Sequence, residues 1–330
     1  MKVLVLGGSG LFGRKTIHYL LEDSRVSCVV SMDLTPPSDL FVKSIGKHME
    51  KFHFIQGDVS SLEDILNALK QYSVEKIVNW GFFMGKTITP DPRLSAKVNV
   101  LGMSNVFEAA KLMGISRVVY ASSVAVYGSQ ADYGDREVTE NDRLFPSHPY
   151  ALAKNLAELM ADQYNQQHGM SLIGLRPTLV FGHGGQTPIV VKWLSETVSF
   201  PAVGKTISLN VDGKRIFSVV SADDIANFTR ILLHAPSPPH TIYNLSGPPC
   251  SLRDVAEAVR KYLPDAIIAF GDQAMIGPGS GDRLPTKISC ARANSDFGFS
   301  VMPLDEAVFI HINDARLEAG LEPIKPASHN

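Results

Sequence analysis

The stretch KVLVLGGSGLFGRKTIHYLL, residues 2–21, decides the fold. Its first five residues form a short apolar run without polar alternation, which is typical of a strand buried on both faces of a sheet. Glycines at positions 7, 10 and 13 follow, and helical periodicity begins at Leu11. A strand, a glycine-rich turn and a helix in this order bring backbone amides towards a pyrophosphate, whereas an isolated glycine-rich turn does not. We therefore predict that a dinucleotide cofactor contacts Gly7, Gly10, Leu11, Phe12 and Gly13.

An acidic residue stands where the second strand of such a unit ends. Asp33 lies twenty residues after Gly13, and its carboxylate can accept hydrogen bonds from the adenosine ribose hydroxyls. The same charge would repel a 2′-phosphate, so we expect NAD rather than NADP; the alternative is that Asp33 caps a turn before Pro36. Asp58 and Val59 follow the third predicted strand, where we expect the adenine pocket, although a surface turn also explains an aspartate there.

From residue 2 to about 175, short Val- and Ile-rich runs alternate with longer segments of helical period. This alternation predicts a doubly wound parallel α/β sheet with crossover helices on both faces. The predicted strands are residues 3–6, 26–32, 52–56, 76–79, 117–121 and 172–175, and the predicted helices begin near Phe12, Ser61, Ser95, Pro149 and Ala222. Beyond residue 177, glycine and proline cluster, which predicts a smaller, loop-rich C-terminal lobe. We expect residues 1–177 to form an NAD-binding Rossmann domain, with a returning segment at about 219–247, and residues 178–218 and 248–330 to form a substrate-binding lobe.

Composition narrows the class of protein. The chain has 330 residues, 45% of them hydrophobic, and a formal charge of −2, so it can bury a large core but has no general field that attracts nucleic acid or an anionic membrane. Cys28, Cys250 and Cys290 are too few and too widely spaced for a metal cluster or a disulfide framework. We see no apolar run of membrane-spanning length and expect no signal peptide. A cytoplasmic protein that binds no metal, nucleic acid or membrane is expected.

Candidate catalytic residues follow the fifth predicted strand. Tyr150 and Lys154 are four residues apart in a segment that begins with Pro149 and has the character of a first helical turn, so their side chains share one face. An ammonium group beside a phenol favours the phenolate, which should move the pKa of Tyr150 from about 10 towards the working pH. Core packing with a solvated lysine would produce the same spacing. However, Ser123 ends the fifth strand at the carboxyl edge where open α/β sheets bind ligands, with Ser122 as the competing donor. The set suits alcohol–ketone interconversion: Tyr150 takes the hydroxyl proton, Ser123 orients the oxygen, and nicotinamide takes the hydride.

Further residues complete an ordered series with those above: Asn99 before Gly102, the run from Ser122 to Gly128, and Arg176-Pro177. The series resembles the landmarks of extended short-chain dehydrogenases, the NAD-dependent epimerase/dehydratase family, over nearly the whole chain and most specifically over residues 1–185. The resemblance implies that Asn99, Tyr150, Lys154 and Pro177 contact NAD, with Lys154 holding the nicotinamide ribose, and that the C-terminal lobe supplies the substrate cleft. It also implies a homodimer through the helices at 98–113 and 150–166, although core burial explains their apolar stripes equally well.

The chain departs from well-known members of that family at positions that bear on the substrate. Ser123 is followed by Val124-Ala125 where sugar-nucleotide 4,6-dehydratases typically have Asp-Glu, so elimination and decarboxylation are disfavoured. Leu179 stands where many nucleotide-sugar enzymes have Asn. Arg215 is the counterpart of their phosphate-binding arginine, but its spacing to Asp223-Asp224 differs from theirs. Phe82 lies where the family often has a smaller residue. If Phe82 lines the cleft it favours an apolar or compact substrate; if it does not, it is a core residue.

We expect the substrate to contact five residues: Phe82, Ser123, Thr178, Leu179 and Arg215. The leading interpretation is an NAD-dependent dehydrogenase that acts at the secondary alcohol or ketone of a small hydroxylated substrate. The alternative is a nucleotide-sugar epimerase that recycles its NAD internally. A third interpretation is a scaffold or sensor that binds NAD without chemistry.

Overall fold

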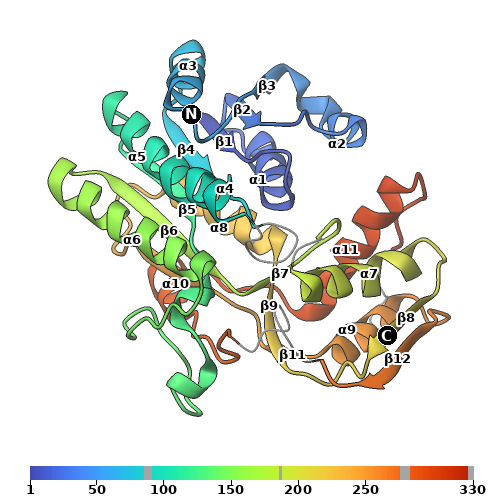
Figure 1. The fold of residues 1–330 in the computed structure, drawn as a ribbon. Coiled ribbons are helices and arrows are strands. Elements are labelled where there is room, and N and C mark those ends of the chain that lie inside the picture. Colours follow the sequence, from blue (N-terminus) through green and yellow to red (C-terminus); the bar gives the residue numbers. More distant parts are fainter. Residues whose placement is uncertain (85–90, 186–187, 276–282, 326–330) are drawn as a thin grey trace.

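The structure is a computed structural model, and it describes residues 1–84, 91–185, 188–275 and 283–325. A seven-stranded sheet with the order β10-β6-β5-β4-β1-β2-β3 forms its centre, and every strand pair in it is parallel (Figure 1). The strands of this sheet are β1 (Lys2–Leu6), β2 (Cys28–Asp33), β3 (Phe52–Gln56), β4 (Lys76–Asn79), β5 (Arg117–Ala121), β6 (Ser171–Pro177) and β10 (Ile242–Leu245). The chain first builds outwards from β1 to β3 and then in the opposite direction from β4 to β10. This is the doubly wound Rossmann arrangement that the sequence predicts.

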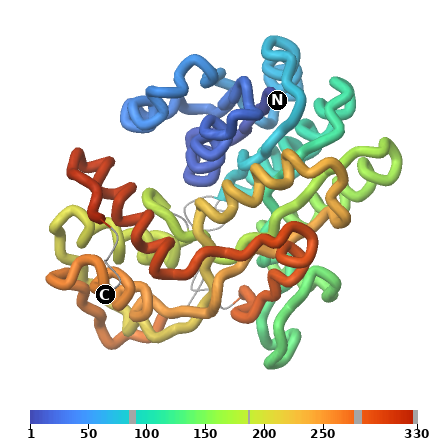
Figure 2. The backbone as a smooth tube through the Cα atoms, turned by 180° about the vertical axis from the view of Figure 1, so that it is seen from behind, coloured from blue at the N-terminus to red at the C-terminus, as the bar shows by residue number. Residues whose placement is uncertain are grey.

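Helices cover both faces of the sheet. They are α1 (Leu11–Glu22), α3 (Leu62–Tyr72), α5 (Met103–Leu112), α6 (Pro149–His168), α8 (Ala222–His234) and α10 (Ala291–Phe297). Val3 and Val5 pack in one apolar cluster with α1, α8 and α10, whereas Leu4 and Leu6 pack in another with α3, α5 and α6. Figure 2 shows α1 and α8 from behind; the two helices pack against each other. Because both faces of the strands are buried, alternation with polar residues is absent from their sequences.

The helices begin at the predicted signals, but the helix predicted near Ser95 is divided into three elements. The Ser61 side chain caps α3 by accepting a hydrogen bond from the Asp64 backbone N–H at 3.2 Å, and Pro149 occupies the first turn of α6. Near Ser95, where a single helix is predicted, the chain forms α4 (Pro92–Ser95), a π-helix η2 (Ala96–Gly102) and then α5. The shorter elements of this part of the chain are α2 (Asp39–Ser44) and the 3₁₀ helices η1 (Gly46–Lys51), η3 (Val124–Tyr127) and η4 (Gln130–Asp132).

The smaller lobe has its own apolar cluster beside the large sheet (Figure 1). Its elements are β7 (Leu179–Phe181), α7 (Ile189–Ala202), β8 (Ile207–Val211), β9 (Phe217–Ser221), β11 (Pro249–Cys250), α9 (Leu252–Tyr262), β12 (Ile268–Gln273) and α11 (Leu304–Glu318). β9 pairs with β7 and β11, and β8 pairs with β12. Within the segment 219–247, α8 and β10 rejoin the large sheet, whereas β9 stays in the sheet of the smaller lobe.

The predicted strands agree closely with the observed ones. Three of them, 52–56, 76–79 and 117–121, have the predicted bounds, and the others differ by at most two residues at either end. In the parts of the chain that the structure describes, no helix has the length and apolar character needed to cross a membrane. No group of three or more metal-ligating side chains is found among those same residues.

Candidate active site

Two positions of the glycine-rich loop admit only glycine. Gly7 has φ +72°, and a Cβ there would lie 2.7 Å from the backbone nitrogen of Gly81, while a Cβ on Gly13 would lie 2.5 Å from the Cα of Gly8. At Gly10, among the described residues, an added Cβ would meet only the Gly7 carbonyl oxygen, at 3.4 Å. Packing within the protein therefore does not require glycine at position 10. The bare backbone there suits the close approach of a ligand.

The first turn of α1 is open to an anion. Its N-cap is Gly10, which has no side chain to accept a hydrogen bond, and the turn contains no acidic residue. The amides of Leu11 and Phe12 lie in this turn, at the positive end of the helix dipole. The loop lies at the carboxyl ends of β1 and β4, where the strand order reverses and α/β sheets bind ligands. This donor set fits the pyrophosphate of NAD.

Asp33 is held beside the loop at the end of β2. Its Oδ2 accepts a hydrogen bond from the Ser9 backbone N–H at 3.0 Å, and its Oδ1 accepts one from the Thr35 backbone N–H at 3.4 Å. The carboxylate is half-buried, so one of its sides remains accessible. The position suits the predicted contact with ribose hydroxyls, and the hydrogen bonds also show that Asp33 shapes the loop and its following turn.

Asp58 and Val59 follow β3 beside the same crevice. Asp58 Oδ2 accepts a hydrogen bond from Lys97 Nζ at 3.3 Å. Val59 packs against η2, because a Cβ on Gly102 would lie 3.1 Å from Val59 Cγ1. Both residues thus have partners within the protein, and their contact with adenine stays a prediction.

Tyr150 and Ser123 come together although they lie on different elements. Tyr150 is in the first turn of α6, whose N-cap is His148; the two rings are stacked with centroids 5.9 Å apart. Ser123 follows β5, and its hydroxyl is near enough to Tyr150 to lower the pKa of the phenol. The Ser123 hydroxyl also accepts a bond from the Ala125 backbone N–H at 3.2 Å. Ser122, the competing donor, instead donates to the buried Glu158. Since Ser122 is engaged with Glu158, Ser123 is the better candidate to act with the phenol.

Lys154 lies beneath this pair and is only 2% exposed. Its Nζ donates to the Ala121 carbonyl oxygen at 2.7 Å, at the end of β5. The ammonium lies 3.5 Å from the centroid of the Phe82 ring and 5.7 Å from that of Tyr150. The Phe82 and Tyr150 rings meet edge to face, with centroids 5.0 Å apart. Phe82, predicted to line the site, is therefore in direct contact with the acid/base pair.

Burial controls the protonation of both groups. It raises the pKa of Tyr150 above its ordinary value, against the lowering effect of the Ser123 hydroxyl. It lowers the pKa of Lys154 well below its ordinary value, against the attraction of Glu158. The expectation that Lys154 lowers the pKa of Tyr150 is therefore wrong for this structure. Desolvation dominates, and the ammonium lies closer to the Phe82 ring than to the Tyr150 ring.

Asn99 positions the segment that carries Phe82. Its Oδ1 accepts a hydrogen bond from the Phe83 backbone N–H at 2.8 Å, and its Nδ2 donates to the Phe83 carbonyl at 2.7 Å and to Ser95 Oγ at 3.0 Å. Both the oxygen and the nitrogen of this buried side-chain amide are therefore hydrogen-bonded within the protein. Direct contact between Asn99 and NAD stays a prediction.

A buried ion pair lies behind the site; a salt-bridge role was considered for Arg176, but its partner Glu158 was not anticipated. Arg176 donates to both carboxylate oxygens of Glu158, at 2.7 and 2.6 Å, and its third bond goes to the Tyr127 hydroxyl at 2.6 Å. Glu158 in turn accepts from Ser122. The network ties α6, β5 and β6 together beside Lys154. Its sequence signal was the position of Glu158, four residues after Lys154 on the same helical face.

The predicted substrate residues of the smaller lobe have mainly structural partners. Pro177 ends β6, and Thr178 donates its backbone N–H to the Leu245 carbonyl at 3.0 Å. Leu179 is 6% exposed and lies in the apolar cluster of the smaller lobe. Arg215 Nη1 donates to the Met275 carbonyl at 3.0 Å. Substrate contact by Thr178, Leu179 and Arg215 stays a prediction, as does cofactor contact by Pro177.

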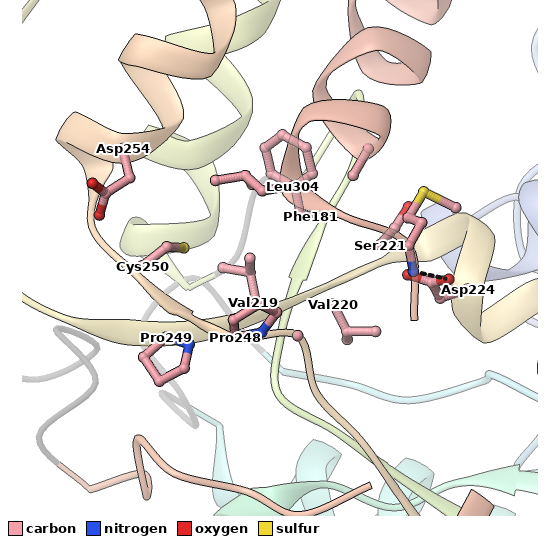
Figure 3. Close-up of a pocket in the computed structure, with 13 residues that line it drawn as sticks. Phe181, Val219, Val220, Ser221, Asp224, Pro248, Pro249, Cys250, Asp254 and Leu304 are labelled. Carbon is pink, nitrogen blue, oxygen red and sulfur yellow. Dashed lines mark hydrogen bonds between the residues drawn. The ribbon is translucent and has the colours of Figure 1, made fainter. Parts of the chain in front are cut away.

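A separate cavity of about 260 Å³ lies between β7, β9 and α11 (Figure 3). Phe181, Val219 and Leu304 supply apolar walls, and Asp224 is its deeply buried carboxylate. Asp224 Oδ1 accepts a hydrogen bond from the Met302 backbone N–H at 3.0 Å. Burial raises the pKa of Asp224 to about 7. None of the residues around this cavity belongs to the Tyr150 site.

Comparison with known proteins agrees with this geometry. A model of the NAD dependent epimerase/dehydratase family matches residues 3–246. An uncharacterised protein of Methanocaldococcus jannaschii is 30% identical over 79% of this chain and 80% of its own length. The UDP-glucose 4-epimerase of Mycolicibacterium smegmatis is 27% identical over 69% of this chain and 71% of its own. The structure of L-threonine dehydrogenase from Clostridium difficile, 19% identical, superposes with a TM-score of 0.82 over 97% of this chain and 99% of its own. The chain belongs to the NAD-dependent epimerase/dehydratase family and is an NAD-dependent enzyme of the extended short-chain dehydrogenase type.

Proposed function

We propose that this protein is a dehydrogenase that interconverts a secondary alcohol and a ketone on a compact hydroxylated substrate and releases NADH after each oxidation. The observation that carries the proposal is the contact of Phe82 with both Tyr150 and Lys154. This ring reduces the space beside the acid/base group, so a small substrate fits better than a nucleotide sugar. Leu179, which lacks the amide of an Asn at that position, supports the same conclusion.

Tyr150 is the proton carrier in this mechanism. Its raised pKa keeps it a neutral phenol at neutral pH, so it donates a proton to the ketone oxygen in the direction of reduction. In the direction of oxidation, Tyr150 accepts the alcohol proton after losing its own. Ser123 holds the same substrate oxygen, and Lys154 supplies a buried positive charge below the phenol. NAD, when bound, accepts the hydride from the alcohol carbon.

Absorbance at 340 nm tests the proposal with purified protein, NAD and a panel of hydroxy acids, free sugars, sugar acids, aromatic alcohols, hydroxysteroids and UDP-sugars. We expect NADH to accumulate with one of the compact classes, and oxidation to become faster as the pH rises because Tyr150 must lose its proton. Failure of every compact class, together with conversion of a UDP-sugar without NADH build-up, would refute the dehydrogenase.

The second candidate function is a nucleotide-sugar epimerase. It is favoured by the similarity to the UDP-glucose 4-epimerase of Mycolicibacterium smegmatis, which extends over 69% of the chain. The cofactor would then be reduced and reoxidised within one turnover. Product analysis with UDP-sugars identifies this activity directly, because the epimer appears while the absorbance at 340 nm stays flat.

A homodimer is the expected assembly. Leu152, Leu156 and Leu159 lie along one side of α6 and are 53%, 40% and 59% exposed, and Leu101 on the neighbouring η2 is 49% exposed. Four exposed leucines on adjoining helices favour a second copy as their partner. In sedimentation, the wild type should be a dimer and Leu156→Asp a monomer. Leu317→Asp, at a leucine 54% exposed on α11, is the matched control and should remain dimeric.

Two further assignments are part of the proposal. The three cysteines are free thiols, which supports a reducing compartment such as the cytoplasm; cell fractionation tests this. Residues 178–218 and 248–330 are assigned to substrate binding, and residues 1–177 with about 219–247 to NAD. If the assignment is correct, substitutions in the first set alter KM for the substrate and leave NAD affinity unchanged.

A further inference from the structure

The ring of Phe82 lies against the buried ammonium of Lys154. The Lys154 ammonium has three N–H donors and is almost completely removed from water, and its described acceptor is the Ala121 carbonyl at 2.7 Å. A buried charge is costly, and burial lowers the pKa of Lys154 in spite of the attraction of Glu158. The face of the Phe82 ring, 3.5 Å away, adds a cation–π contact that helps to stabilise the ammonium.

The backbone on both sides of Phe82 is held in place, whereas its side chain is not fully enclosed. Asn99 fixes both backbone groups of the next residue, Phe83, and Gly81 lies directly against the glycine-rich loop at Gly7. The Phe82 segment therefore lines the crevice between the cofactor loop and Lys154. Its ring is only half-buried, in contrast to Lys154.

These observations conflict with the role of Lys154 in the proposed function. The Ala121 carbonyl takes one N–H of Lys154, and the Phe82 ring covers another side of the ammonium. A cofactor hydroxyl that accepts from Lys154 on the covered side displaces the ring. The ring and the cofactor therefore compete for one charge. We propose that Phe82 is an internal competitor of NAD, which covers Lys154 in the empty site and leaves it when the cofactor binds.

The inference rests on the proposed function and explains one of its requirements. A dehydrogenase must release its reduced cofactor after every turnover, whereas an epimerase retains it. A ring that returns to Lys154 lowers the affinity for both cofactor forms and favours their exchange. Phe82 thus determines how long the cofactor stays.

Calorimetric titration with NAD and thermal unfolding, each on the full chain, test the inference without measuring catalysis. Phe82→Ala should bind NAD about tenfold more tightly, because the free protein loses its cation–π contact. The same variant should unfold at a lower temperature than wild type without NAD, and the difference should shrink when NAD is saturating. Phe82→Tyr keeps the ring and should restore wild-type affinity. Phe83→Ala, at the neighbouring phenylalanine, is the matched control and should not tighten binding.

The opposite pattern identifies Phe82 as a fixed wall. In that case Phe82→Ala binds NAD equally or more weakly, and its loss of thermal stability is the same with and without NAD; either result overturns the inference. Phe82→Leu provides a second variant that retains apolar volume without a ring, and it too should bind NAD more tightly. A wild-type protein that binds no NAD would sink the proposed function itself, which is a distinct result.

Discussion

The edge of the large sheet and the core of the smaller lobe differ in the roles of their polar side chains. At the carboxyl edge of the sheet, Asp33 contacts the glycine-rich loop, and Lys154 bonds the end of β5 next to Ser123. In the smaller lobe, Leu179 is part of an apolar cluster and Arg215 bonds a backbone carbonyl. Cofactor binding and proton transfer thus require particular residues at particular places. The smaller lobe is specified mainly by packing, and it identifies its substrate far less clearly.

The largest expected effect comes from the phenol. Tyr150→Phe removes the proton carrier and should lower turnover about 10²–10⁴-fold with the NAD affinity retained. Tyr262→Phe makes the same change on α9 of the smaller lobe and should leave turnover unaltered. Steady-state kinetics on the substrate found in the panel checks both. Full activity in Tyr150→Phe would show that the crevice holds a different acid/base group.

Ion pairs in the two regions should contribute differently to the free energy of unfolding. Glu158→Gln leaves Arg176 buried without its counter-charge and should cost about 3–5 kcal/mol of unfolding free energy. The matched change in the smaller lobe is Glu196→Gln, which breaks a more exposed pair with Lys192 on α7 and should cost less than about 1 kcal/mol. Urea unfolding measures both. Equal losses would mean that the buried pair behind the active site contributes no more to stability than the exposed pair on α7.

Two glycines of the same loop should behave differently. Gly13→Ala forces a methyl group against Gly8 and should destabilise the fold by about 3 kcal/mol. Gly10→Val should leave the stability nearly unchanged and weaken NAD binding, since the space beside Gly10 is open within the protein. Thermal unfolding and NAD titration separate the two effects. Unaltered NAD affinity in Gly10→Val would contradict the pyrophosphate site.

The buried carboxylate of the smaller lobe gives a pH prediction. The pKa of Asp224 is raised from 3.8 to about 7 in the folded state, so the folded protein binds the proton more tightly than the unfolded chain. Its contribution to stability is complete below about pH 4 and is lost as the pH rises to about 7. Asp224→Asn should remove a fall of about 2 kcal/mol between pH 5 and 7. The exposed Asp265→Asn should leave the pH profile of urea unfolding as it is in wild type.

The smallest effect concerns the choice of cofactor. Asp33→Asn keeps an oxygen for the Ser9 N–H but removes the negative charge. The preference for NAD over NADP should fall about tenfold, because a 2′-phosphate is no longer repelled. Asp58→Asn, whose carboxylate pairs with Lys97, serves as the control. A preference that does not change in Asp33→Asn would show that another group reads the ribose.

Local signals account for what the sequence could predict. Strand and helix positions follow from apolar runs, the Ser61 cap and Pro149, and the spacing of Tyr150 and Lys154 already places them on one helical face. The carboxyl end of β5 then brings Ser123 to them, because parallel strands end at a common edge. Much of the cofactor and acid/base site is therefore visible in the order of residues.

What the sequence could not predict depends on side chains that meet through the fold. The bonds from Arg176 to Glu158 join a strand and a helix, and the contact of Phe82 with Lys154 joins two segments 72 residues apart. The direction of the Tyr150 pKa shift was missed for the same reason. Spacing reveals a nearby charge but does not reveal how completely burial removes water from both groups.

The fate of a labelled hydrogen tests the central claim most directly. The substrate identified in the panel is deuterated at its alcohol carbon and incubated with the enzyme and NAD in ordinary water, and mass spectrometry locates the deuterium. The account predicts deuterated NADH free in solution and a ketone product without the label. Deuterium returned to the same carbon of an epimerised product, with no NADH released, would contradict it.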